Sequence, residues 1–240
     1  MANRKNNFKK VIVIILTIIL VLAGGFFIYA LDYYRADDFA VQTFNRGGYS
    51  VKSEKNIFIF QSDKEKESDT ALIFYPGGKV EAIAYAPLLE KLSQQGITCV
   101  LVKMPFNLSV FNVNAADGIY SRLPNIRNWY IGGHSLGGAM ASSYVNKDSE
   151  KIKGLILLGA YPVGNSNIDT LAIFGSEDML LDKTKLETTS KRIEIAGGNH
   201  AYFGNYGEQK GDGTATITRP EQQQQTVDEV IKFVFGQIQR

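Results

Sequence analysis

Apolar and polar positions divide this chain into one long apolar run and a longer region of alternating patterns. Residues 11–31 contain no charged side chain. As a helix with a rise of about 1.5 Å per residue, this run would match the hydrocarbon core of a bilayer, which is about 30 Å thick. After residue 48, short apolar runs alternate with amphipathic stretches, which predicts a domain of strands and helices.

Eight of the short runs are predicted to be strands. Several of them, such as residues 71–74 and 155–158, are continuously apolar, which is typical of parallel strands buried on both faces. The predicted strands are residues 49–53, 57–61, 71–75, 98–103, 129–131, 152–158, 171–174 and 192–195.

Helical patterns lie between these strands. Residues 85–95 have Pro87 near the start and Gly96 just past the end, and residues 136–147 are rich in small side chains. A last helix from Pro220 carries an apolar stripe at three- and four-residue spacing: Val227, Val230, Ile231, Val234, Phe235 and Ile238. Residues 106–126 are expected to form a helix linking two strands. The alternation predicts an α/β fold whose mostly parallel sheet has helices on both faces.

The residues around the long apolar run predict how it is oriented. Four basic residues precede it within the first ten positions, and acidic residues dominate directly after it. By the positive-inside rule, the N-terminus is cytoplasmic and the domain lies outside the membrane. The chain would then consist of a basic tail (1–10), a transmembrane anchor (11–31), a connector (32–48) and a domain (49–240). The alternatives are a cleaved signal peptide and a buried core helix. The run exceeds the usual signal core of about 7–15 residues, and Ile28 is bulky where a cleavage site needs a small residue.

Composition and charge exclude several classes of protein. The net charge is +2, and without the four basic residues of the tail the remaining 22 basic and 24 acidic residues sum to −2. Nothing in this charge pattern resembles the clustered basic surface that nucleic-acid binding needs, so such binding is not expected. Cys99 is the only cysteine, so no disulfide forms within the chain and a core position is expected. With only two histidines, neither a metal nor any other cofactor is expected.

The main chemical motif is Gly133-His134-Ser135-Leu136-Gly137, which has the pattern G-x-S-x-G. The pattern alone is weak, and a glycine-rich turn that binds phosphate or merely packs is the alternative. Its position between a short strand and a helix of small residues indicates a nucleophile elbow. We expect Ser135 to be the nucleophile, with Gly133 and Gly137 allowing the sharp turn.

A serine nucleophile needs a base and a carboxylate. His134 is expected to point away from the hydroxyl, which leaves His200, in a glycine-rich loop after the last strand, as the base. Asp178, in the loop after residues 171–174, is the expected acid. Its rivals are Glu177 and, behind it, Asp182. The order Ser, Asp, His along the chain is the order associated with this elbow.

The oxyanion of such a reaction needs preorganised N–H donors. One is expected from the backbone of Leu136, directly after the nucleophile. The other is expected from the Pro-Gly-Gly-Lys loop after the third strand, at Gly78 or Lys79. An ordinary Pro-Gly turn is the alternative for this loop.

On these motifs the chain resembles lidless α/β-hydrolases of the dienelactone-hydrolase type, with a bacterial membrane anchor added. The resemblance covers residues 50–240 and includes the Gly-Ser-Glu-Asp loop (175–178) and the Gly-Gly-Asn-His segment (197–200). It implies the same roles for Ser135, Asp178 and His200, and for Leu136 with Gly78 or Lys79. Many members have His-Gly in the oxyanion loop, and the hydrolase of that name often uses cysteine where serine stands here.

The expected function is therefore that of a membrane-anchored, extracytoplasmic serine hydrolase. It would cleave a carboxylic ester, or a similar acyl bond, of a small molecule through an acyl-enzyme. An acyltransferase with the same triad, or a non-catalytic surface binding module of the same fold, are the alternatives. Only twelve residues (159–170) join the sixth and seventh strands, too few for a helical lid, so a preference for short acyl groups is expected.

Overall fold

The computed structural model describes residues 2–46, 51–61, 68–147, 150–187 and 189–238, with the side chains of 2–8 and 237–238 left out. The chain forms two compact units, residues 1–33 and 34–240, which are described separately. The first unit contains helix α1 (Ala2–Leu31). Its segment Lys9–Leu31 is long and apolar enough to cross a membrane, a test that an N-terminal signal sequence also passes.

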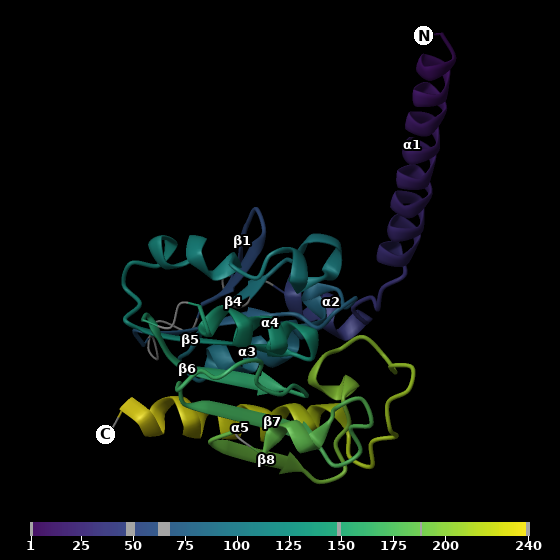
Figure 1. The fold of residues 1–240 in the computed structure, drawn as a ribbon. Helices are drawn as coiled ribbons and strands as arrows, with labels where there is room; N and C mark the ends of the chain where they lie inside the picture. The colour runs from purple at the N-terminus through teal and green to yellow at the C-terminus, as the bar shows by residue number, and fades with distance from the viewer. Residues whose placement is uncertain (1, 47–50, 62–67, 148–149, 188, 239–240) are drawn as a thin grey trace. The chain divides into compact units, whose positions relative to one another are not determined.

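The second unit is built on an eight-stranded sheet in the order β1-β2-β4-β3-β5-β6-β7-β8 (Figure 1). Strand β2 pairs antiparallel with both of its neighbours, β1 and β4, and all other neighbouring strands are parallel. This confirms the predicted mostly parallel α/β sheet of eight strands. The strands are β1 (Val51–Glu54), β2 (Ile57–Phe60), β3 (Thr70–Tyr75), β4 (Thr98–Val102), β5 (Asn128–His134), β6 (Ile152–Leu158), β7 (Thr170–Gly175) and β8 (Lys191–Ile195). The predicted strand at 49–53 begins in residues outside the described part.

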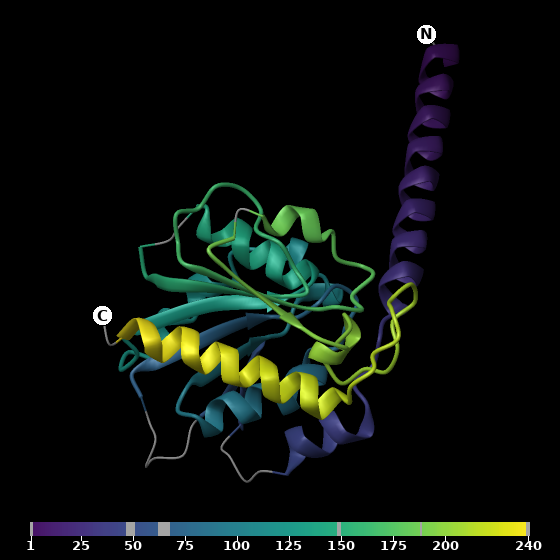
Figure 2. The same ribbon diagram turned by 90° about the horizontal axis from the view of Figure 1, so that it is seen from below.

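Helices cover both faces of the sheet because its central strands are apolar on both sides. In β3, Leu72 and Phe74 point to the core under α3 (Ala86–Gln94) and α5 (Arg219–Ile238). Ile73 and Tyr75 point to the core under α4 (Leu136–Val145). Figure 2 shows α5 on one face and α4 on the other. Cys99 is fully buried in the first of these cores, as expected.

Residues 34–46, predicted as part of a connector, belong to the compact unit. Tyr34 donates its N–H to the carbonyl of Lys79, and Asp37 donates its own to Asn205. Helix α2 (Asp38–Asn45) follows, capped by the Asp37 carboxylate, which accepts from the N–H of Ala40. These long-range backbone contacts have no signature in the local pattern.

The segment between β4 and β5 was expected to be a helix and instead forms a series of short 3-10 turns. They span Pro105–Asn107, Ser109–Phe111, Ala115–Gly118 and Tyr120–Arg122. Phe106 and Asn107 have φ of 55° and 54°, outside the right-handed helical region. The buried Tyr75 hydroxyl holds the segment, since it donates to the carbonyl of Val113 at 2.9 Å and accepts from the N–H of Ala116 at 3.0 Å.

Candidate active site

The predicted site residues lie at the carboxyl ends of parallel strands or in the segments that follow them. Tyr75 of β3 pairs with Gly133 of β5, and His134 of β5 pairs with Leu158 of β6. Gly175 of β7 likewise pairs with Ile195 of β8. The loops after β3, β5, β6, β7 and β8 therefore meet at one edge of the sheet, where α/β folds place their ligands.

Ser135 occupies a strained turn at this edge. Its φ of 51° and ψ of −123° lie where few non-glycine residues are found. Its N–H donates to the carbonyl of Leu158 at 2.9 Å, and the residue is partly exposed directly before α4. A Cβ at Gly133 or at Gly137 would collide with the backbone of Tyr75, so only glycine lets the turn pack this closely. A nucleophile elbow requires a strained strand-to-helix turn of this kind.

His200 and Asp178 form a buried hydrogen-bonded pair. Nδ1 of His200 lies 2.8 Å from Oδ2 of Asp178, and the two side chains are 3% and 0% exposed. The other carboxylate oxygen accepts the N–H groups of Leu180 and Leu181, both at 3.0 Å. Because Nδ1 donates to the carboxylate, Nε2 of a neutral His200 carries a lone pair. Nε2 is buried and has no hydrogen-bond partner among the described residues.

The two rival carboxylates are engaged elsewhere. Glu177 accepts from the neighbouring Ser176 hydroxyl at 2.8 Å. Asp182 caps the short turn Lys183–Leu186 and accepts from the hydroxyl of Thr184 at 2.6 Å. Of the three carboxylates, Asp178 is the one that contacts His200 in the described structure.

Gly159, the residue after β6, connects the elbow to the histidine–carboxylate pair. It follows Leu158, whose carbonyl accepts from Ser135, and its φ is +52°. A Cβ at Gly159 would lie 2.9 Å from Nδ1 of His200 and 3.1 Å from Oδ2 of Asp178. The missing side chain therefore lets the pair lie directly against the end of β6.

The loop after β3 offers one unengaged N–H next to the elbow. Gly77 donates to the Tyr85 hydroxyl at 3.0 Å, and Lys79 donates to the carbonyl of Asn107 at 2.8 Å. The N–H of Gly78 has no acceptor within the described part of the chain. A Cβ at Gly78 would lie 2.8 Å from Cδ2 of Leu136, so the two residues are in contact. Leu136 is the first residue of α4, where backbone N–H groups have no helical partner. The geometry favours Gly78 over Lys79 as the second donor.

His134 is fully buried and makes hydrogen bonds through both ring nitrogens, in agreement with its expected direction away from the serine hydroxyl. Nδ1 lies 2.8 Å from the Tyr85 hydroxyl, and Nε2 lies 3.1 Å from the carbonyl oxygen of His200. The ring centroids of the two histidines are 4.5 Å apart. Burial, and then the proximity of His200, hold the pKa of His134 well below its usual value, so the ring is neutral at pH 7.

Sequence reasoning missed two side chains that hold the His200 loop. Oδ1 of Asp212 accepts from the N–H of His200 at 3.2 Å, and its Oδ2 accepts from Ala201 at 2.9 Å. Gln222 of α5 is fully buried, accepts from the N–H of Asn199 and donates to the carbonyl of the same residue. The Gly-Asp-Gly segment (211–213) was the available sequence signal for Asp212, whereas Gln222 is the first of four consecutive glutamines and had no such signal.

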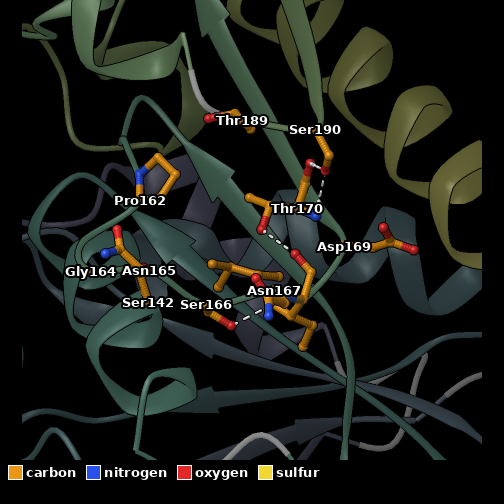
Figure 3. Close-up of a pocket in the computed structure, with 12 residues that line it drawn as sticks. Ser142, Pro162, Gly164, Asn165, Ser166, Asn167, Asp169, Thr170, Thr189 and Ser190 are labelled. Carbon is orange, nitrogen blue, oxygen red and sulfur yellow. Dashed lines mark hydrogen bonds between the residues drawn. The ribbon is translucent and has the colours of Figure 1, made fainter.

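A cavity of about 360 Å³ lies away from these residues, at the amino-terminal end of β7 (Figure 3). Its hydroxyl groups serve mainly to hold the loop: Ser190 donates to the carbonyl of Thr170, and Ser166 accepts from the N–H of Ile168. The described residues contain no cluster of three or more His, Cys, Asp or Glu side chains that could hold a metal ion.

Comparison with known families agrees with this geometry. The profile of the Alpha/beta hydrolase family matches residues 71–224, from β3 into α5. The chain belongs to the alpha/beta hydrolase family. This confirms the family resemblance drawn from the motifs and makes the protein a hydrolase by class.

Solved structures share the fold at low sequence identity. Est1E from Butyrivibrio proteoclasticus is 14% identical, with a TM-score of 0.58 over 79% of this chain and 98% of its own. A dienelactone hydrolase from Anabaena variabilis is 18% identical, with a TM-score of 0.53 over 75% and 93%. A structure described as a membrane phospholipase A is 12% identical, with a TM-score of 0.55 over 93% and 99%. No curated protein sequence matches the chain significantly.

Proposed function

We propose that this protein is a membrane-anchored serine hydrolase that cleaves carboxylic esters through Ser135, His200 and Asp178. The observation that carries the proposal is the buried His200–Asp178 pair, whose unpartnered Nε2 lies at the same sheet edge as the strained Ser135. Such a pair supplies the base that a serine hydroxyl needs. Esterases and a dienelactone hydrolase among the proteins of similar fold support ester chemistry.

In the first half of the reaction, the hydroxyl oxygen of Ser135 attacks the carbonyl carbon of the ester while Nε2 of His200 takes the hydroxyl proton. Asp178 stabilises the resulting imidazolium through Nδ1. The carbonyl oxygen, as it becomes negative, accepts hydrogen bonds from the N–H groups of Gly78 and Leu136, which stabilise the charge. The tetrahedral intermediate then expels the alcohol, which receives the proton from His200, and leaves an acyl group on Ser135.

In the second half, water takes the place of the alcohol. His200 removes a proton from water as the oxygen attacks the acyl carbon, and the same two N–H groups hold the second oxyanion. Collapse returns the proton to Ser135 and releases the carboxylic acid. If an alcohol enters instead of water, the same intermediate produces a new ester, which is the acyltransferase alternative.

We further propose that residues 11–31 anchor the protein and that residues 32–240 lie outside the cytoplasm. The basic tail before the apolar run and the acidic residues after it support this orientation. The membrane phospholipase A of similar fold, which aligns with 93% of the chain, supports work at a membrane.

Labelling with a fluorophosphonate probe tests the proposal. The full chain in detergent should be labelled, and mass spectrometry should locate the adduct on Ser135. Ser135→Ala should abolish labelling, and His200→Ala should reduce it to a similar residual level because triad members act as a unit. A folded wild-type protein without label would favour the non-catalytic module. Product partitioning between water and added alcohol separates hydrolase from acyltransferase.

A further inference from the structure

A second chain of hydrogen bonds lies beneath the candidate site and links its two sides. The N–H of Gly77 is 3.0 Å from the Tyr85 hydroxyl, which is 2.8 Å from Nδ1 of His134. Nε2 of His134 is in turn 3.1 Å from the carbonyl oxygen of His200. Tyr85 and His134 are both fully buried, so water does not compete for these bonds.

The direction of every bond in this chain follows from the chemistry of its end groups. A carbonyl oxygen only accepts, so Nε2 of His134 must carry the hydrogen. Since His134 is neutral, Nδ1 has a lone pair and accepts from the Tyr85 hydroxyl. The oxygen of Tyr85 then accepts the N–H of Gly77. All three bonds are made in one protonation state, without a conflict between donors.

The chain connects the two groups that must be aligned in the proposed reaction. Gly77 directly precedes Gly78, whose N–H we assign to the oxyanion site. The other end is the main chain of His200, the proposed base. A Cβ at Gly77 would lie 2.7 Å from the Tyr85 hydroxyl and 2.8 Å from Nδ1 of His134. Glycine is therefore required for the loop to rest on both polar groups.

We propose that Tyr85 and His134 are positioning residues that hold the oxyanion loop and the His200 main chain in one fixed arrangement. This inference rests on the proposed hydrolase function. Donors that are already aligned stabilise a developing charge without reorganising, so the benefit appears in the transition state. Loss of the link should therefore lower kcat and leave KM nearly unchanged.

Tyr85→Phe isolates the hydroxyl, because the ring still packs against Phe74, whose centroid is 5.1 Å away. We expect kcat for a short p-nitrophenyl ester to fall about tenfold, with KM changed less than about twofold. Affinity for an alkyl boronic acid, which adds to Ser135 as a tetrahedral mimic, should fall by the same factor as kcat.

Tyr206→Phe is the matched control. Tyr206 is also buried, and its ring centroid lies 6.4 Å from that of Tyr85. Its hydroxyl donates to Oε1 of Gln209 at 2.9 Å and takes no part in the chain. This variant should lose stability to a similar extent and keep wild-type kcat. Thermal unfolding of both variants checks that each is folded at the temperature of the assay.

Replacements of His134 test the other end of the chain without depending on Tyr85→Phe. His134→Gln keeps an amide N–H that can reach the His200 carbonyl, whereas His134→Phe fills the space with no donor or acceptor. We expect His134→Gln to retain at least about five times more of the wild-type kcat than His134→Phe, since one hydrogen bond is restored.

The outcomes separate the inference from the function on which it rests. A wild-type protein that the fluorophosphonate labels, with Tyr85→Phe at wild-type kcat and boronate affinity, would overturn the inference alone. Equal kcat for His134→Gln and His134→Phe would do the same. A wild-type protein that is folded and does not label would overturn the proposed function.

Discussion

At the scale of single residues, the candidate site combines one strained residue, Ser135, with a carboxylate that its hydrogen bonds hold in place. Ser135 has a positive φ, while the carboxylate of Asp178 accepts three hydrogen bonds and cannot rotate freely. The backbone N–H groups of Leu180 and Leu181 hold one oxygen, so the other faces His200. The imidazole is thereby presented in one tautomer, with its free nitrogen at Nε2.

Asp178→Asn should lower kcat by about 10⁴ while leaving the fold intact. The two backbone donors will keep the amide oxygen on their side, which turns the amide nitrogen toward Nδ1 of His200. His200 must then carry its proton on Nε2 and cannot accept one from Ser135. Steady-state kinetics on a short ester measure the loss. Glu177→Gln is the control and should change kcat little. The reverse ranking of the two variants would move the acid to Glu177.

His134 should make stability fall as pH falls below about 6.5, the usual histidine pKa. Its pKa is lowered in the folded protein, so below pH 6.5 the unfolded chain binds a proton that the folded chain does not. Stability then rises with pH in that range, by up to about 1.4 kcal/mol per pH unit. Urea unfolding at pH 7, 6 and 5 should show a steeper loss for the wild type than for His134→Gln. Parallel curves for the two proteins would contradict the prediction.

At the scale of elements, the loops decide how open the site is. The connection between β6 and β7, residues 159–169, contains neither helix nor strand. The 3-10 turns after β4 lie next to the loop after β3, since Lys79 donates to the carbonyl of Asn107. These turns leave large apolar side chains exposed, namely Phe106 (45%), Val110 (46%) and Phe111 (52%). The turns contain no α-helix, so they do not form a helical lid that would enclose a long acyl chain.

We therefore expect kcat/KM for p-nitrophenyl esters to be highest for short acyl chains. Each methylene of the acyl chain that stays in water forgoes about 0.8 kcal/mol of binding free energy. A long acyl chain that is not enclosed therefore binds no better than a short one. A series from acetate to palmitate, measured below and above the micelle concentration, checks this. A rise toward palmitate, or a jump in rate when micelles form, would indicate a lipase that works at lipid surfaces.

At the scale of the whole molecule, the chain separates into an apolar helix and a unit that contains every candidate site residue. The compact unit begins at Tyr34, whose N–H donates to the carbonyl of Lys79 in the loop after β3. The first residues of this unit therefore contact the loop that carries Gly78.

Removal of residues 2–33 should give a soluble fragment whose kcat on a short ester is within about twofold of the full chain. No candidate site residue is lost, and the bond from Tyr34 to Lys79 is kept. Removal of residues 2–46 should lower activity and stability together, because α2 and that bond are lost. Kinetics and thermal unfolding of both fragments measure this. Equal activity of the two fragments would show that residues 34–46 do not support the site.

Much of the fold follows from local pattern, which is why it was predictable. Short, continuously apolar runs are typical of parallel strands that are buried on both faces, and these runs predicted the parallel sheet. The stripe in α5, with Val227, Val230 and Val234, matches the buried core because helical periodicity is a local property. Ser135, with glycines two positions on either side, is recognisable because a strained turn restricts the residues within it.

The remaining features depend on contacts between distant residues and are therefore seen only in the folded chain. The choice of Asp178 over Glu177 is a matter of which carboxylate reaches His200, and neighbours in sequence do not differ in pattern. The N–H of Lys79 donates to the carbonyl of Asn107, 28 residues away, a contact that no local pattern predicts. The 3-10 turns after β4 are held by a tyrosine hydroxyl from β3, which no local signal announces. Sequence alone determined the class of chemistry and the strand order along the chain. Packing determined which groups meet, because hydrogen bonds between remote segments form only once the sheet has brought the strand ends together.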